Sequence, residues 1–136
     1  MERLHFLELL VNKILGIFLI VGGSLRNHPT GIFQITSNGY FASISNYGTI
    51  SAQSPQTLVQ GQTLANYGNL TQFSLKFSTV ENYLGTWEIG QSSSYDVSTV
   101  LIKGGVLIGS AFISGSIEHY DGSIDIGKKY SKIPCF

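Results

Sequence analysis

The chain is poor in cysteine and in histidine. It has one cysteine, Cys135, among 136 residues, which excludes an intrachain disulfide framework. The three histidines, His5, His28 and His119, are too scattered for a familiar zinc-ligand spacing. The sequence also lacks a P-loop, an HExxH motif, a nucleophile elbow and a dinucleotide fingerprint. We therefore expect no metal, no cofactor and no enzymatic activity.

Charge is scarce as well. Charged residues make up 12% of the chain and the net charge is zero, whereas about 25% is usual in soluble domains. With no basic patch, the composition argues against a nucleic-acid partner. The low charge indicates a surface covered by neighbouring chains, by lipid, or by Ser, Thr, Asn and Gln side chains.

The N-terminal region is strongly apolar, with an uninterrupted run, ILGIFLIV, at residues 14–21. Apolar residues also recur there with the 3-4 spacing of a coiled-coil seam. The seam consists of Leu4, Leu7, Val11, Ile14, Phe18, Val21 and Leu25. We therefore predict a hydrophobic α-helix over residues 1–25 that acts as an oligomerisation stem.

Two other interpretations of this region stay open. Residues 6–23 approach the length of a membrane anchor, although Glu8, Asn12 and Lys13 interrupt them. A cleaved secretory signal would fit the apolar run, but Glu2 and Glu8 do not suit its basic first part.

Beyond a linker at residues 26–31, strand-like runs alternate with turn signals over residues 32–130, and residues 131–136 form a tail. The region from 53 to 62, which contains Pro55, is predicted to be a loop or irregular edge. The predicted strands are Ile32–Thr36, Tyr40–Ile44, Thr49–Ala52, Leu70–Val80, Thr86–Gly90, Val97–Lys103, Val106–Ile117 and Ser123–Ile126. Short strands with frequent turns predict a mainly β domain, an antiparallel β-sandwich or jelly-roll-like barrel.

The stretch GSIEHYDGSIDIG, at residues 115–127, contains the clearest turn signal. Asp121-Gly122 is typical of a type I′ hairpin turn, and Asn38-Gly39 is a second signal of this kind. A hairpin about Asp121-Gly122 would place Glu118 opposite Asp125 on one face. The tripeptide Asn-Tyr-Gly occurs at residues 46–48 and again at 66–68, which hints at two similar strand–turn units.

Five residues are candidates for ligand contact. Trp87, Tyr95 and Tyr120 could stack on sugar rings, while Glu118 and Asp125 could accept hydrogen bonds from sugar hydroxyls. Trp87 could equally lie in the core. The two carboxylates could alternatively hold a cation, act as a glycosidase pair, or simply be solvated.

The segment from Trp87-Glu88-Ile89-Gly90, through Tyr95-Asp96-Val97-Ser98, to the Gly115–Ile126 hairpin motif resembles the C-terminal β domains of bacteriophage tail-fibre and receptor-binding proteins. The earlier ITSNGYFASISNYGTIS resembles the opening strand pair of the same domains. The resemblance implies a trimer that associates with other virion proteins and binds bacterial surface carbohydrate.

These observations together predict a non-enzymatic, virion-associated or extracellular adhesion protein. It would form a homo-oligomer, a trimer, and bind a host surface glycan. A membrane-anchored β-sandwich protein and a capsid-decorating protein without a ligand are the alternatives.

Overall fold

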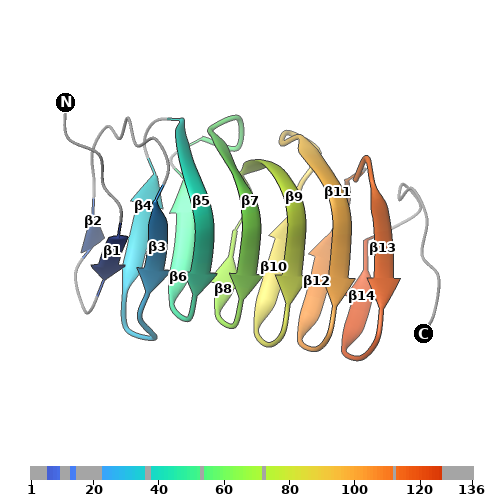
Figure 1. The fold of residues 1–136 in the computed structure, drawn as a ribbon. Coiled ribbons are helices and arrows are strands. Elements are labelled where there is room, and N and C mark those ends of the chain that lie inside the picture. The colour runs from blue at the N-terminus through green and yellow to red at the C-terminus, as the bar shows by residue number, and fades with distance from the viewer. Residues whose placement is uncertain are drawn as a thin grey trace.

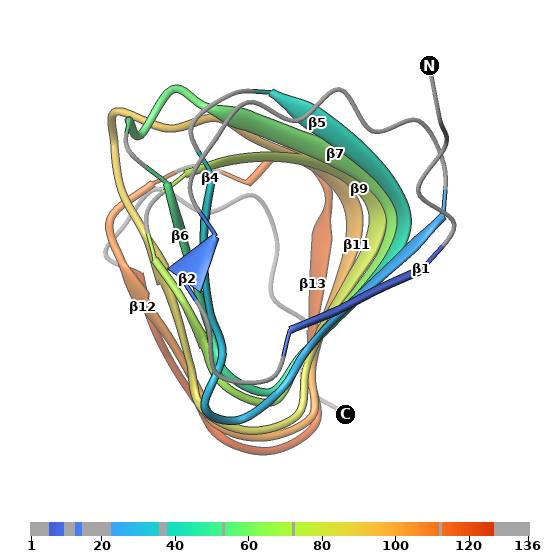
Figure 2. The ribbon, with the colours of Figure 1, turned by 90° about the vertical axis from the view of Figure 1, so that its left-hand side faces the viewer.

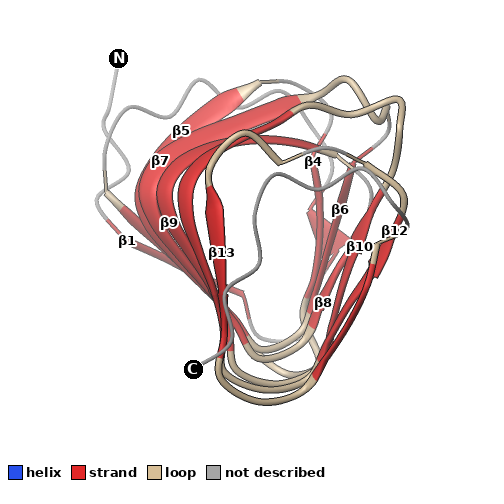
Figure 3. Ribbon diagram, turned by 90° about the vertical axis from the view of Figure 1, so that its right-hand side faces the viewer, coloured by secondary structure: helices blue, strands red, loops and turns tan. Residues whose placement is uncertain are grey.

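The computed structural model describes residues 6–9, 13–14, 23–35, 38–52, 54–71, 73–111 and 113–126. All regular structure within these ranges is β-strand (Figure 3). The strands are β1 (Phe6–Leu9), β2 (Lys13–Ile14), β3 (Ser24–Asn27), β4 (Ile32–Ile35), β5 (Gly39–Asn46), β6 (Thr49–Ala52), β7 (Leu58–Asn66), β8 (Asn69–Leu70), β9 (Ser74–Asn82), β10 (Thr86–Ile89), β11 (Tyr95–Ile102), β12 (Val106–Gly109), β13 (Ser116–His119) and β14 (Ser123–Asp125).

The chain winds as a parallel β-solenoid (Figure 1). Odd-numbered strands form one seven-stranded sheet, sheet A, in the order β1-β3-β5-β7-β9-β11-β13. Even-numbered strands form the other, sheet B, and every strand pair in both sheets is parallel. Each coil of the solenoid is therefore one sheet A strand, a short turn, one sheet B strand and a connection to the next coil.

The core lies between the two sheets, which face each other when the solenoid is viewed along its axis (Figure 2). Apolar side chains at equivalent positions of successive coils stack on one another, because the parallel register repeats each position along the axis. On sheet A one such buried row is Leu25, Ile44, Leu64, Val80, Val100 and Ile117. On sheet B the facing buried row is Phe33, Ile50, Leu70, Trp87 and Leu107.

The predicted antiparallel sandwich or jelly roll is therefore wrong, and so is the predicted hairpin. The chain turns at Asp121-Gly122, and Gly122 has a positive φ of 81°, but Asp121 lacks the positive φ that the predicted type I′ turn requires. The observed turn carries the chain from β13 in sheet A to β14 in sheet B, so the two strands do not pair. A turn sequence specifies a local change of direction, and the partner of each strand is decided by which apolar rows meet in the core.

The predicted N-terminal helix is also wrong, because the region contains strands β1, β2 and part of β3. Leu7, Ile14 and Leu25 of the predicted seam lie in these strands. Leu4, Val11, Phe18 and Val21 lie outside the described residues. Leu7 is in register with the buried Leu25, so an apolar pattern that fits a helix seam is here used by a strand that extends sheet A.

The structure also differs from two other predictions, the linker at residues 26–31 and the loop at residues 53–62. The predicted linker, residues 26–31, contains the end of β3 and the buried Asn27. The predicted loop at 53–62 contains the first half of β7, at the centre of sheet A. Within the part of the chain that the structure describes, no helix has the length and apolar character needed to cross a bilayer.

Candidate functional site: the corner stripe and the hydroxyl row

A ladder of buried asparagines fixes the corner where the chain leaves sheet A. Asn27, Asn46, Asn66 and Asn82 end four successive sheet A strands and are all 0% exposed. The first three side-chain amides each donate to the Oδ1 atom of the next asparagine, at distances of 2.9, 2.9 and 2.7 Å along the ladder. Buried amides are stable in such positions when their hydrogen bonds are made, and the ladder supplies a donor for the Oδ1 atoms of Asn46, Asn66 and Asn82. At the first rung, Asn27 Oδ1 is buried and has no hydrogen-bond partner among the described residues.

Asn27, Asn46 and Asn66 each also donate to a backbone oxygen of their own turn. Asn46, for example, donates from Nδ2 to the backbone oxygens of Gly48 (3.1 Å) and Asn69 (3.0 Å). The turns of successive coils then pack backbone on backbone, so that a Cβ atom at Gly68 would lie 2.1 Å from the Gly48 oxygen. This close stacking explains why the third residue of the Asn-Tyr-Gly repeat is glycine.

Beside the ladder lies what we call the corner stripe, which consists of Tyr47, Tyr67, Tyr83, Lys103 and Tyr120. The three tyrosines at 47, 67 and 83 directly follow ladder asparagines, and Lys103 and Tyr120 occupy the equivalent positions of the next two coils. Its first three members, the tyrosine stack, have parallel rings. The centroids of Tyr47 and Tyr67 are 4.6 Å apart with planes 6° apart, and those of Tyr67 and Tyr83 are 4.8 Å apart with planes 5° apart. These distances match the roughly 4.7–4.9 Å spacing of neighbouring strands, which places equal side chains directly on one another.

Cations lie over both ends of the stack. The Arg26 guanidinium carbon is 5.5 Å from the Tyr47 ring centroid, and the Lys103 ammonium nitrogen is 5.3 Å from the Tyr83 centroid. Both distances are within the range of a cation–π attraction. The faces of all three rings are therefore occupied, and the rings expose edges to solvent.

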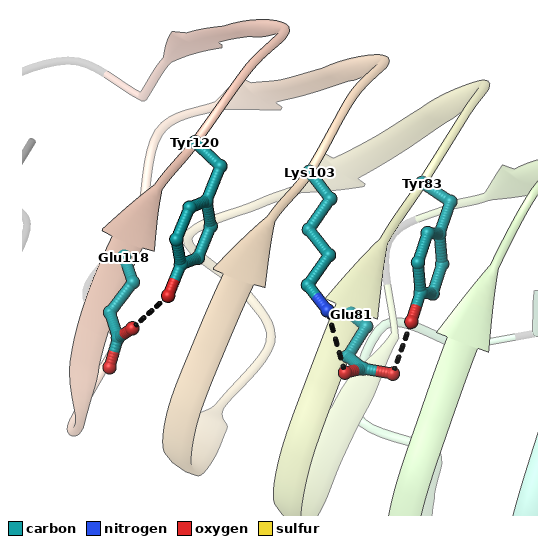
Figure 4. Close-up of polar contacts among 5 residues, drawn as sticks. All are labelled: Glu81, Tyr83, Lys103, Glu118 and Tyr120. Carbon is teal, nitrogen blue, oxygen red and sulfur yellow. Dashed lines mark hydrogen bonds and ion pairs between the residues drawn. The ribbon is translucent and has the colours of Figure 1, made fainter. Parts of the chain in front are cut away.

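Carboxylates accept hydrogen bonds from two phenols of the stripe (Figure 4). The Tyr83 hydroxyl donates to Glu81 Oε1 at 2.9 Å, and the Lys103 Nζ atom lies 3.6 Å from Oε2 of the same carboxylate. Tyr120 donates to Glu118 at 2.7 Å. Partial burial, followed by the Glu81 bond, raises the pKa of Tyr83. The bond to Glu118 is the main reason that the pKa of Tyr120 is raised.

A second regular feature, the hydroxyl row, lies on the outer face of sheet A. At one position of every coil from β3 to β13 the residue is serine or threonine, and the strand register places these residues side by side. The row is Ser24, Ser43, Thr63, Thr79, Thr99 and Ser116, all of them partly or fully exposed. The Oγ atoms of Ser24 and Ser43 are 2.9 Å apart, within hydrogen-bond distance.

One side of the hydroxyl row is polar and nearly neutral, whereas the other side carries Arg26, Glu81 and Glu118, two residues after Ser24, Thr79 and Ser116. The residues just before the row positions in the three central strands, Gln62, Ser78 and Ser98, are exposed. Further along the strands, Gln60 is in register with Lys76, and Lys76 with Asp96, so the charges there are of opposite sign.

The structure separates the predicted ligand residues. Trp87 and Tyr95 are only 1% and 3% exposed, and their rings meet edge to face in the core at 6.1 Å. The Tyr95 phenol oxygen accepts a hydrogen bond of 2.9 Å from the Gly90 amide. Neither ring offers a face to a surface ligand.

Of the other three, Glu118 and Tyr120 are brought together at the corner. Asp125 lies in sheet B, where it is in register with Ile108, while Glu118 is in register with Leu101 in sheet A. The two carboxylates thus do not form the predicted pair. Within the described ranges, no group of three or more His, Cys, Asp or Glu residues could hold a metal ion.

Sequence reasoning missed the hydroxyl row and the tyrosine stack. The repeated Asn-Tyr-Gly was the available signal, together with Asn82-Tyr83, since one such pair in each of three coils implies stacking once the strands are parallel.

Comparison with known proteins adds no relative: no family model, no curated protein and no solved structure matches this chain. The resemblance to tail-fibre domains stays a prediction.

Proposed function

We propose that this protein is a non-enzymatic adhesion protein that binds an extended, neutral surface glycan along the hydroxyl row of sheet A. The observation that carries the proposal is the uninterrupted succession of serine and threonine at one position of six neighbouring strands. Its action at a virion or host surface is the prediction made from the sequence.

The row suits a sugar polymer for two reasons. Serine and threonine hydroxyls both donate and accept hydrogen bonds, as sugar hydroxyls do. The row also runs along the straight axis of the solenoid, across strands that lie side by side (Figure 1). An extended β-linked glycan advances by one sugar ring over a length close to the roughly 4.8 Å between strands, so each ring would meet one rung.

The surroundings favour a neutral polymer over a charged one. Gln62 adds an amide donor and acceptor beside the row, Gln60 adds another further along the same strand, and Lys76 is offset by Asp96. A repeated array also lets several weak contacts act together, because each later contact forms at a high effective concentration.

The test uses the variant Thr63→Val, Thr79→Val, Thr99→Val, which removes three hydroxyls and keeps the β-branched shape that strands favour. Retention of the wild-type chain is measured first on insoluble cellulose, chitin and mannan. On a retaining polymer the variant should bind at least about tenfold more weakly, since each lost hydrogen bond is worth roughly 0.5–1.5 kcal/mol.

The matched control is Thr49→Val, Thr86→Val on the outer face of sheet B, where both residues are partly exposed. It should bind as the wild type does. Equal weakening in both variants, or no retention of the wild type on any of the three polymers, would overturn the proposal.

A further inference from the structure

We infer that the tyrosine stack is a site of oxidative cross-linking, at which Tyr67 and Tyr83 become joined ring to ring as dityrosine. The inference does not depend on glycan binding. It rests on the geometry of two side chains from successive coils and on the carboxylate beside one of them.

The rings are already placed for coupling. Their centroids are 4.8 Å apart and their planes differ by 5°, and parallel strands point both phenols to the same side. The ring carbons next to the two hydroxyls are therefore on the same side of the stack and near one another. These are the carbons that carry the unpaired electron in a phenoxyl radical, so two radicals formed here need little movement to join.

Glu81 supplies the acceptor that phenol oxidation requires. When an electron leaves the Tyr83 ring, the phenol proton must leave as well, and it can move along the 2.9 Å hydrogen bond to the Glu81 carboxylate. The stack is partly exposed, so an oxidant can reach the ring edges.

The oxidant we name is a haem peroxidase with hydrogen peroxide. Each phenol loses one electron and one proton, the two radicals form a carbon–carbon bond, and the hydrogens on the bonded carbons return to the oxygens. The two electrons and two protons reduce one peroxide to two waters. The product joins the turn after β7 to the turn after β9 and so ties two successive coils covalently.

The chain contains its own control. Tyr120 makes the same kind of phenol–carboxylate hydrogen bond, to Glu118 at 2.7 Å. The corner position of the coil before it carries Lys103 in place of tyrosine. Tyr120 should thus be oxidised without coupling inside the molecule.

The experiment treats the dilute full chain with the peroxidase and maps cross-links by mass spectrometry. A bond between Tyr67 and Tyr83 joins the tryptic peptides 27–76 and 77–103 and lowers the mass of the chain by two hydrogens. We expect this link in a species that stays monomeric on a denaturing gel, with dityrosine fluorescence.

Three variants test the assignment of the cross-link to Tyr67 and Tyr83. Tyr67→Phe keeps a stacked ring and should abolish the link, whereas Tyr120→Phe should leave its yield unchanged. Glu81→Gln should slow the reaction at Tyr83. Links spread evenly over Tyr40, Tyr95 and Tyr120, or links only between molecules, would overturn the inference even if a variant failed to fold, because the wild-type map alone shows them.

Discussion

Replacing Asn66 with alanine tests whether the asparagine ladder holds the coils together. The Asn66 amide nitrogen donates to Asn82 Oδ1 at 2.7 Å and to the Gly68 oxygen at 3.2 Å, and its own Oδ1 accepts from Asn46 at 2.9 Å. The residue is 0% exposed, so water does not replace these bonds. Its removal leaves the Asn82 oxygen buried without a donor.

The magnitude follows from these contacts. A buried acceptor without a partner costs about 1–3 kcal/mol, and each other lost bond contributes about 0.5–1.5 kcal/mol. We therefore expect Asn66→Ala to lower the free energy of unfolding by about 3–5 kcal/mol, near the upper end of single-residue effects.

Urea unfolding measures the change, with far-UV circular dichroism for the sheets and fluorescence for Trp87, which is 1% exposed in the core. The control is Asn69→Ala, an exposed position on sheet B that should change stability by less than about 0.5 kcal/mol. A loss below about 1 kcal/mol in Asn66→Ala would refute the reasoning, because the ladder would then contribute no more than a surface contact.

Two further predictions concern stability. Gly68→Ala should lower the free energy of unfolding in urea by about 1–3 kcal/mol, since its Cβ would meet the Gly48 oxygen at 2.1 Å. Gly39→Ala, whose Cβ would have its nearest neighbour at 3.9 Å, should be tolerated, and equal effects of the two substitutions would contradict the close stacking of turns. Burial raises the pKa of Tyr95 above 10.0, so the folded state keeps a proton that the unfolded state releases, and stability should fall as pH rises past 10.0. Tyr95→Phe should lose less stability over the same pH range in urea titrations, and an unchanged slope would show that Tyr95 is not its source.

Much of the local structure was predictable from the sequence. Thr49–Ala52 is a strand with the predicted bounds, and the chain turns at Tyr47-Gly48 and at Asp121-Gly122, although the second turn is not of the predicted type I′. These features depend on residues close together in the chain. Turn chemistry and alternating burial act over a few residues and are visible there.

The pairing of strands was not predictable by the same means. Alternation of apolar and polar residues is identical in parallel and antiparallel strands, so it does not reveal that the chain moves to a second sheet at each turn. The repeat that would have revealed it is irregular, because Asn27, Asn46, Asn66 and Asn82 are separated by 19, 20 and 16 residues. At the next rung the ladder position is Ile102, which conceals the repeat further.

The candidate site could not be predicted from the sequence for the same reason. Thr63, Thr79 and Thr99 are far apart in the sequence and become neighbours only through the parallel register. Trp87, by contrast, was a plausible surface aromatic until its strand was placed in sheet B with the ring facing the core. A solenoid creates surfaces from equivalent positions of successive coils, which a search for local motifs does not detect.

The most direct test of the proposed function is the affinity of the full chain for linear oligosaccharides of increasing length, cut from a polymer that retains it. The hydroxyl row has six described rungs, from Ser24 to Ser116. If each sugar ring meets one rung, affinity should rise with length up to about six rings and then level off, given the strand spacing of about 4.8 Å. An affinity that is already maximal for a disaccharide would contradict binding along the row.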